Sequence, residues 1–132
     1  MVMEAFHLDG AIGPIFCLAW SPPPETPPRF GVLCIPPFAE ENNKSRRMIA
    51  QQARALARLG GMTLLVDMTG TGDSVSDFRD ATWEHWRRDL DVAWSWLTAR
   101  VQNPLWIWGI RLGGLLAAQQ EHFGAINPEG LL

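Results

Sequence analysis

Two glycines flank an arginine where the sequence passes from a short apolar run to an amphipathic one. The segment Gly109-Ile110-Arg111-Leu112-Gly113 has the spacing of the Gly-x-Ser-x-Gly turn that joins a strand to a helix and raises a nucleophile. Small residues on both sides of the centre let the backbone turn sharply. Arg111 takes the nucleophile's position, and a guanidinium stays protonated and cannot attack a carbonyl carbon. The alternative interpretation is that Gly109 and Gly113 only allow a strand and a helix to pack closely.

A second candidate lies just after the apolar run Phe30–Ile35, in the segment Pro36-Pro37-Phe38-Ala39. A backbone N–H at such a place can pair with the N–H that follows a nucleophile to form an oxyanion hole. By position, the two donors would be the N–H groups of Phe38 and Leu112. The alternative is an ordinary loop, extended by its two prolines.

A glycine-rich loop after the run Met62–Val66 supplies the third set of candidates. It lacks the Lys of a phosphate-binding P-loop and the third glycine of a dinucleotide fingerprint, so we expect no nucleotide. Its acidic residues do not match a calcium loop, and no His has metal-ligand spacing with another His or Cys. We therefore expect no metal and no cofactor. The loop residues closest to the predicted site are Gly70, Gly72, Asp73 and Ser74.

Strands and helices must position these candidates, and the apolar patterns predict both. Short apolar runs bounded by Pro or Gly predict strands. These are Ala5–Leu8, Ile15–Trp20, Phe30–Ile35, Met62–Val66 and Leu105–Trp108. Apolar residues at helical spacing predict three helices. These are Asn42–Leu59 with a stop at Gly60-Gly61, a helix capped by Asp80 that runs to about Arg100, and Leu112–His122.

The order of these elements predicts an α/β fold. Strands and helices alternate from Phe30 onward, which is typical of parallel strands joined by right-handed crossovers. The first two strands lie close in sequence and predict an antiparallel entry hairpin. We therefore expect a hairpin followed by βαβαβα, forming a mostly parallel sheet with helices on both faces.

Composition limits the function classes. The chain has 132 residues, 47% hydrophobic and 19% charged, which is typical of one globular domain over residues 1–132. Eleven Lys and Arg against fourteen Asp and Glu argue against nucleic-acid binding. No apolar run has the ~20 residues of a membrane span, and the N-terminus does not resemble a secretory signal. Two cysteines, Cys17 and Cys34, are too few for a disulfide scaffold, so we expect a cytoplasmic protein with buried thiols.

Taken together, these residues resemble the α/β-hydrolase superfamily. The resemblance covers about Phe30 to Ala118. The segments Pro36–Met48, Gly70–Ser74, Asp80–Trp86 and Leu105–Gly113 make the chain similar to the exosortase A system-associated hydrolases of the second type. The resemblance implies a serine-aminopeptidase-like or esterase-like protein encoded in a bacterial locus for exopolysaccharide synthesis.

The sequence departs from this resemblance in two ways. Arg111 replaces the nucleophile, and the acid and the His that follow later strands in the superfamily have no counterpart. His122 would lie roughly 15 Å along the helix from the turn, too far to act as the base. We therefore expect the amino-terminal half of a hydrolase fold, that is, a truncated and catalytically incompetent chain. The strand Leu105–Trp108 would then form a bare apolar edge that invites self-association.

Three functional hypotheses stay open at this stage. The chain could descend from a serine-hydrolase lineage acting on esters, thioesters or amides, with Asp73, Ser74 or Ser76 as substitute nucleophiles and no evident base. It could be a non-catalytic protein that binds a small anionic or acyl ligand through Arg111 at a helix N-terminus. It could also be an incomplete gene product without a function of its own.

Overall fold

The computed structural model describes residues 1–37, 40–71, 81–102, 104–110 and 130–131. Six strands and two helices lie within these residues. In chain order they are β1 (Val2–Asp9), β2 (Pro14–Ser21), β3 (Phe30–Ile35), α1 (Glu40–Arg58), β4 (Gly61–Val66), α2 (Trp83–Thr98), β5 (Leu105–Gly109) and β6 (Gly130–Leu131). The five predicted strands and the first two predicted helices are therefore confirmed, with ends shifted by a few residues at most. The predicted helix Leu112–His122 lies outside the described residues.

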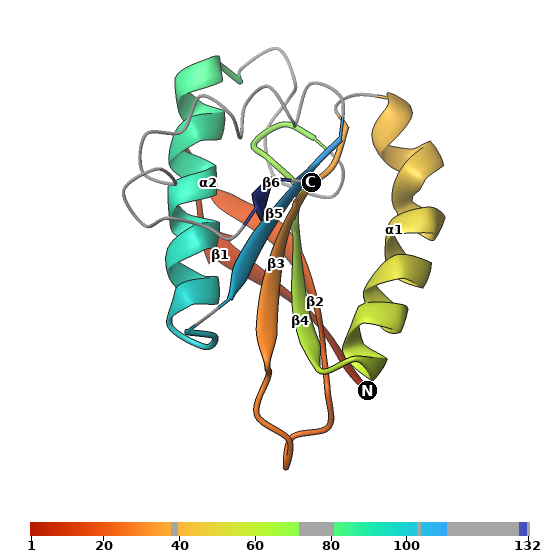
Figure 1. Cartoon of the computed structure of the whole chain (residues 1–132). Coiled ribbons are helices and arrows are strands. Elements are labelled where there is room, and N and C mark those ends of the chain that lie inside the picture. Colours follow the sequence, from red (N-terminus) through yellow and green to blue (C-terminus); the bar gives the residue numbers. More distant parts are fainter. Residues whose placement is uncertain (38–39, 72–80, 103, 111–129, 132) are drawn as a thin grey trace.

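The strands form one sheet in the order β1-β2-β4-β3-β5-β6 (Figure 1). The pairs β1–β2 and β2–β4 are antiparallel, whereas β3 pairs in parallel with both β4 and β5. The predicted entry hairpin and the parallel strands after it are thus confirmed. The carboxyl ends of β3, β4 and β5 consequently lie together at one end of the sheet, which we call its carboxyl edge.

Helices cover both faces of the sheet, as predicted. Figure 1 shows α2 on one side and α1 on the other, with the strands between them. The larger core lies on the α2 side, where Leu90, Trp94 and Leu97 pack against side chains such as Leu33 and Leu64. A smaller core lies on the α1 side. Its buried members are Trp20, Cys34, Ile49, Ala53 and Leu65.

Local sequence explains where α1 ends. Gly60 has a φ of 95°, a left-handed conformation that a residue with a Cβ adopts at a cost. A Cβ there would also lie 2.8 Å from Cδ of Arg29. The helix therefore stops at Arg58, and the predicted stop at Gly60-Gly61 is confirmed.

The start of α2 differs from the prediction. Thr82, not Asp80, is the N-cap: its hydroxyl accepts a hydrogen bond from the His85 N–H at 3.1 Å. Nδ1 of His85 accepts one from the Thr82 N–H at 3.2 Å, which completes a capping box. The prediction was wrong because Asp and Thr are both good N-caps, and the capping-box partner here is a His instead of the usual Glu or Gln.

The edge at β5 also differs from the prediction. Trp106 and Ile107 pair in parallel with the two-residue strand β6, at Gly130 and Leu131. The segment Leu105–Trp108 is therefore not a bare edge along its whole length. The prediction missed β6 because two residues are too few to carry a detectable strand pattern.

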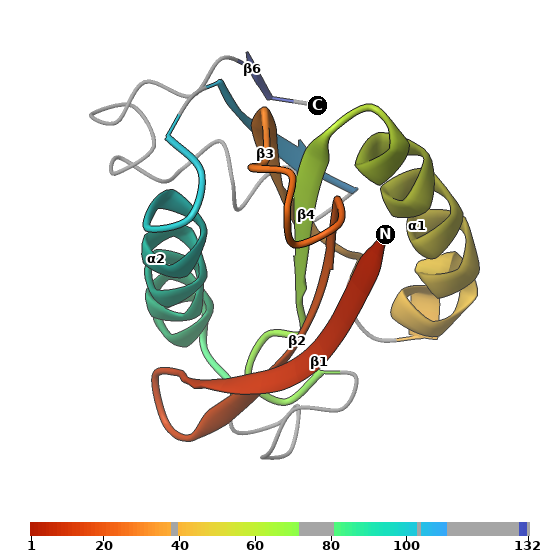
Figure 2. The same ribbon diagram turned by 90° about the horizontal axis from the view of Figure 1, so that it is seen from below.

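The hairpin β1–β2 is strongly twisted. Figure 2 shows it curling from the side of α1 towards α2. The Phe6 ring stacks on Trp96 of α2 with a centroid distance of 4.9 Å, and the Arg100 guanidinium lies 3.8 Å above the centre of a Trp96 ring. Aromatic and cation–π contacts of this kind attach the hairpin to the outer side of the helix.

Candidate functional site

Strand β5 ends at the residue from which the predicted turn would start. Gly109 is the last residue of β5 and pairs in register with Ile35, the last residue of β3. The Ile110 N–H then donates a hydrogen bond of 3.0 Å to the Ile35 carbonyl, so β5 stays attached to β3 up to the turn. The residue that follows β3, Pro36, is buried. The two predicted oxyanion donors, Phe38 and Leu112, thus belong to segments that follow neighbouring strands, β3 and β5, at the carboxyl edge of the sheet.

A buried ion pair lies at the end of β4. The Asp67 carboxylate is fully buried, and Nη2 of Arg46 on α1 lies 2.9 Å from its Oδ1 and 2.8 Å from its Oδ2. The Arg46 side chain is 24% exposed. The Asp67 N–H donates to the Phe16 carbonyl of β2 at 2.9 Å. This pair connects α1 to the carboxyl edge of the sheet and neutralises the acid there.

The loop that follows is fixed by a second buried acid, Asp89 of α2. Its Oδ2 accepts from the Thr69 N–H at 2.7 Å and from the Thr69 hydroxyl at 2.6 Å, and its Oδ1 accepts from the Ala11 N–H at 2.8 Å. The Trp86 indole N–H donates to the Thr69 carbonyl at 2.9 Å. One carboxylate therefore holds the β1–β2 turn and the loop after β4 in fixed positions.

The loop turns at Gly70. This residue has a φ of 76°, and the N–H and hydroxyl of Thr71 both donate to the Met68 carbonyl, at 2.9 and 2.8 Å. The turn needs a left-handed residue, which explains a glycine at this position.

Only two of the predicted site residues are described by the structure. Gly70 follows β4 and Gly109 ends β5, on the two strands that flank β3. Both lie at the carboxyl edge of the sheet. The remaining predicted positions lie outside the described residues. These are Phe38, Gly72, Asp73, Ser74, Arg111, Leu112 and Gly113.

The two thiols do not provide a nucleophile. Burial, together with the smaller effect of the negative charges of Asp67 and Asp89, raises the pKa of Cys17 to about 12. Burial also raises the pKa of Cys34 well above its ordinary value, and the nearby Arg46 opposes this only in part. Both thiols are free and stay protonated near neutral pH, so neither forms a reactive thiolate.

Sequence reasoning missed the residues that hold the site together. Asp89 lies three residues after Trp86 and four before Ala93, so it falls on the apolar stripe of its helix. A carboxylate on a buried stripe indicates a specific set of donors, and this signal was present in the sequence. The pair Arg46–Asp67 gave no comparable signal, because α1 carries several arginines at similar spacing.

Among the residues that the structure describes, no cluster of three His, Cys, Asp or Glu side chains could hold a metal ion. Within the same part of the chain, no helix combines the length and apolar character needed to cross a membrane.

Solved structures with the same arrangement are numerous. An α/β serine hydrolase without a lid from Xanthomonas campestris superposes with a TM-score of 0.78 over 98% of this chain, at 23% identity. This chain has the α/β-hydrolase fold. A thioesterase domain from the curacin biosynthetic pathway gives a TM-score of 0.75 over 99% of the chain at 20% identity. A thermostable carboxyl esterase from Bacillus coagulans gives 0.73 over 99% at 17% identity.

The α/β-hydrolase match covers only part of each neighbour. The chain spans 59% of the Xanthomonas protein, 45% of the curacin domain and 43% of the Bacillus esterase. No protein-family model and no curated protein matches the sequence. At these identities the comparisons establish the fold, and activity has to be argued from residues.

Proposed function

We propose that this chain is a member of the α/β-hydrolase family, of serine-hydrolase or esterase-like lineage, that does not hydrolyse substrates by itself. The observation that carries the proposal is Gly109 at the end of β5, paired with Ile35 of β3. By sequence spacing, Arg111 follows two residues later, at the position that the nucleophile takes in the Gly-x-Ser-x-Gly pattern. A protonated guanidinium has no lone pair to form an acyl intermediate.

The described acids at the same edge support this proposal. Asp67 is paired with Arg46, and Asp89 accepts three hydrogen bonds from Thr69 and Ala11. Carboxylates engaged in this way are fixed structural groups, not general bases with access to a water molecule. Cys17 and Cys34 are buried and protonated.

We propose that this edge of the sheet binds a ligand instead. Arg111 at the predicted helix N-terminus, with the N–H groups of Phe38 and Leu112, would bind a carboxylate, a phosphate or the carbonyl of an acyl group. The favoured ligand is therefore a small anion or an acyl compound.

Two measurements test the proposal. Purified protein is expected to hydrolyse p-nitrophenyl butyrate no faster than buffer, because a guanidinium at the nucleophile's position cannot attack the ester. Calorimetric titration with acetate, phosphate and acetyl-coenzyme A is expected to give heat with the wild type and with the control Arg54→Ala, but none with Arg111→Ala. Ester turnover by the wild type that disappears in Arg111→Ala would refute the proposal that the chain is inactive. Negligible heats for both the wild type and Arg111→Ala would refute ligand binding.

The sequence resemblance adds a biological setting to the proposal. We infer a cytoplasmic protein, one partial domain over residues 1–132, encoded in a bacterial exopolysaccharide locus with an exosortase A system. Sequencing of the flanking DNA tests this, because polysaccharide-synthesis and sorting genes are expected as neighbours. The same sequence tells whether the remainder of the hydrolase fold is encoded alongside, in the same or another frame.

A further inference from the structure

The two faces of β5 are covered to very different degrees. Leu105 and Ile107 face α2 and are 4% and 2% exposed. Trp106 and Trp108 alternate with them, point to the α1 side and remain partly exposed. Strands inside a parallel sheet are normally covered on both faces, so two partly exposed indoles next to each other call for an explanation.

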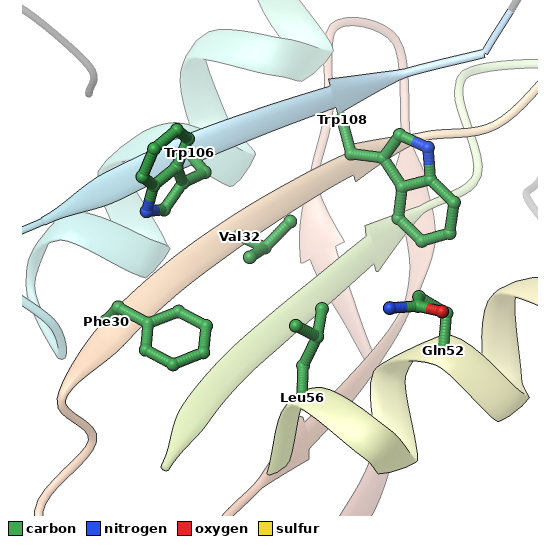
Figure 3. A pocket seen from close by; sticks show the side chains of 6 residues that line it. All are labelled: Phe30, Val32, Gln52, Leu56, Trp106 and Trp108. Atoms are coloured by element: carbon green, nitrogen blue, oxygen red, sulfur yellow. The ribbon is translucent and has the colours of Figure 1, made fainter. Parts of the chain in front are cut away.

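A cavity lies on this α1 side. It has a volume of about 360 Å³ and is lined by four side chains of the sheet and two of α1. They are Phe30 and Val32 of β3, Trp106 and Trp108 of β5, and Gln52 and Leu56 of α1. Figure 3 shows the two indoles on β5 and, across the cavity, the Gln52 amide extending into the space between Trp108 and Leu56.

The lining specifies the chemistry of an occupant. Three aromatic rings and two aliphatic side chains form most of the wall, and none of the six described lining residues carries a charge. An anionic ligand would lose part of its hydration there without meeting an opposite charge, whereas a neutral ligand has no charge to desolvate. The Gln52 amide can both donate and accept; among the six described lining residues, the other polar side-chain groups are the indole N–H donors of Trp106 and Trp108. The volume lies at the small end of the range for organic ligands, ~300–1,000 Å³.

We propose that this cavity binds a neutral acyl compound, with its aliphatic chain against the rings of Phe30, Trp106 and Trp108 and its amide or ester group at Gln52. A second hollow shares Phe30 and Trp106 with the first and continues along Arg29, Leu59 and Pro104. A longer chain can therefore extend past Phe30. An α-helix about 10 Å across occupies roughly 400 Å³ per turn, so it could insert only individual side chains.

This proposal does not depend on the proposed function. The cavity lies beside α1, and its described lining residues come from α1, β3 and β5 alone, so we expect Arg111→Ala to leave it unchanged. Anion binding by Arg111 and amide binding in the cavity are therefore tested separately, and one proposal can be refuted without affecting the other.

Indole resonances measure the binding directly. The chain has seven tryptophans, and Trp106→Phe and Trp108→Phe identify two of the seven Nε1–H signals in a ¹⁵N-labelled sample. Octanamide is expected to shift these two signals in a saturable manner. The signals of Trp20 and Trp94, which are 1% and 0% exposed, are expected to stay in place. Hexanamide and decanamide should bind more weakly and more tightly, by about three- to fourfold per CH₂.

A matched pair of variants tests the polar contact. Gln52→Leu should weaken octanamide binding about fivefold, the effect of one hydrogen bond, whereas Gln51→Leu should not change it. Both residues are exposed side chains of α1, so both variants are expected to fold, which circular dichroism confirms. Octanoate should bind at least about tenfold more weakly than octanamide to the wild type because its charge is unpaired in the cavity.

Three results would overturn the proposal. The first is no saturable shift of the Trp106 and Trp108 signals with any of the amides. The second is equal affinity for octanoate and octanamide. The third is a shift of the same signals with protein concentration alone, since a second copy of the chain would then cover this face.

Discussion

Asp89 and Thr69 are joined by two hydrogen bonds inside the protein, from the Thr69 N–H at 2.7 Å and from its hydroxyl at 2.6 Å to the same carboxylate oxygen. The residues come from α2 and from the loop after β4, and the other oxygen of Asp89 holds the Ala11 N–H. The fully buried carboxylate is thus satisfied by three donors. This side chain therefore fixes the positions of two loops, the β1–β2 turn and the loop after β4.

Replacement of Asp89 by Asn is expected to destabilise the protein by about 1–3 kcal/mol. An Asn side chain keeps one acceptor oxygen, and its NH₂ group would face a donor instead of accepting from it. Urea unfolding measures the change, with Asp9→Asn on the exposed end of β1 as the control. A variant within experimental error of the wild type would show that the three hydrogen bonds contribute little.

The ion pair of Arg46 and Asp67 yields the second prediction. Arg46→Met leaves the fully buried Asp67 without its guanidinium and should cost about 3 kcal/mol of unfolding free energy. The neighbouring Arg47, which is exposed, serves as the control in Arg47→Met. Combining Arg46→Met with Asp67→Asn should recover part of the loss, because the uncompensated charge is removed. A double variant less stable than Arg46→Met would contradict this explanation.

Thr63 gives a prediction of the opposite sign. Its hydroxyl is buried in the sheet and has no hydrogen-bond partner among the described residues. Thr63→Val keeps the shape and removes the unsatisfied group, so it should raise stability by about 1 kcal/mol and increase Tm. Thr71→Val is the contrast, since the Thr71 hydroxyl donates to the Met68 carbonyl and its loss should lower Tm. A fall in Tm for Thr63→Val would count against an unsatisfied hydroxyl.

The buried thiol of Cys17 predicts how stability depends on alkaline pH. Its pKa is raised from 9.0 to about 12, so the folded state holds the proton where the unfolded state has lost it. The contribution of this thiol to the free energy of unfolding is complete below about pH 9 and is lost as the pH rises towards 12, because the unfolded state ionises first. Urea midpoints measured across this window should fall less steeply for Cys17→Ala. Native protein should also resist a disulfide reagent at neutral pH and react after unfolding.

The sequence was most informative where one local pattern decides the structure. The continuous apolar run Phe30–Ile35 has the same bounds as β3, because a strand buried on both faces needs apolar side chains at every position. The stop after α1 followed from Gly60, whose left-handed backbone suits no other residue as well. Local pattern misled at the start of α2, where we predicted Asp80 as the N-cap and the structure shows Thr82.

Long-range relationships were not predictable in this way. Nothing local indicates that β2 pairs with β4, that Arg46 is the arginine that reaches Asp67, or that Gly130 and Leu131 join the sheet. Each depends on where the whole chain brings distant residues together. The predicted roles of Arg111, Phe38 and Leu112 lie outside the described residues and stay predictions.

The pairing of β2 with β4 sets an order of events during synthesis. The hairpin Val2–Ser21 leaves the ribosome before β4, yet the side of β2 that faces away from β1 pairs, at Cys17–Trp20, with Thr63–Val66. The nascent hairpin must therefore wait until β3, α1 and β4 have emerged, and until then one of its edges is open to other chains. A translational pause placed before residue 63 would prolong this exposure, whereas one placed after residue 66 would not.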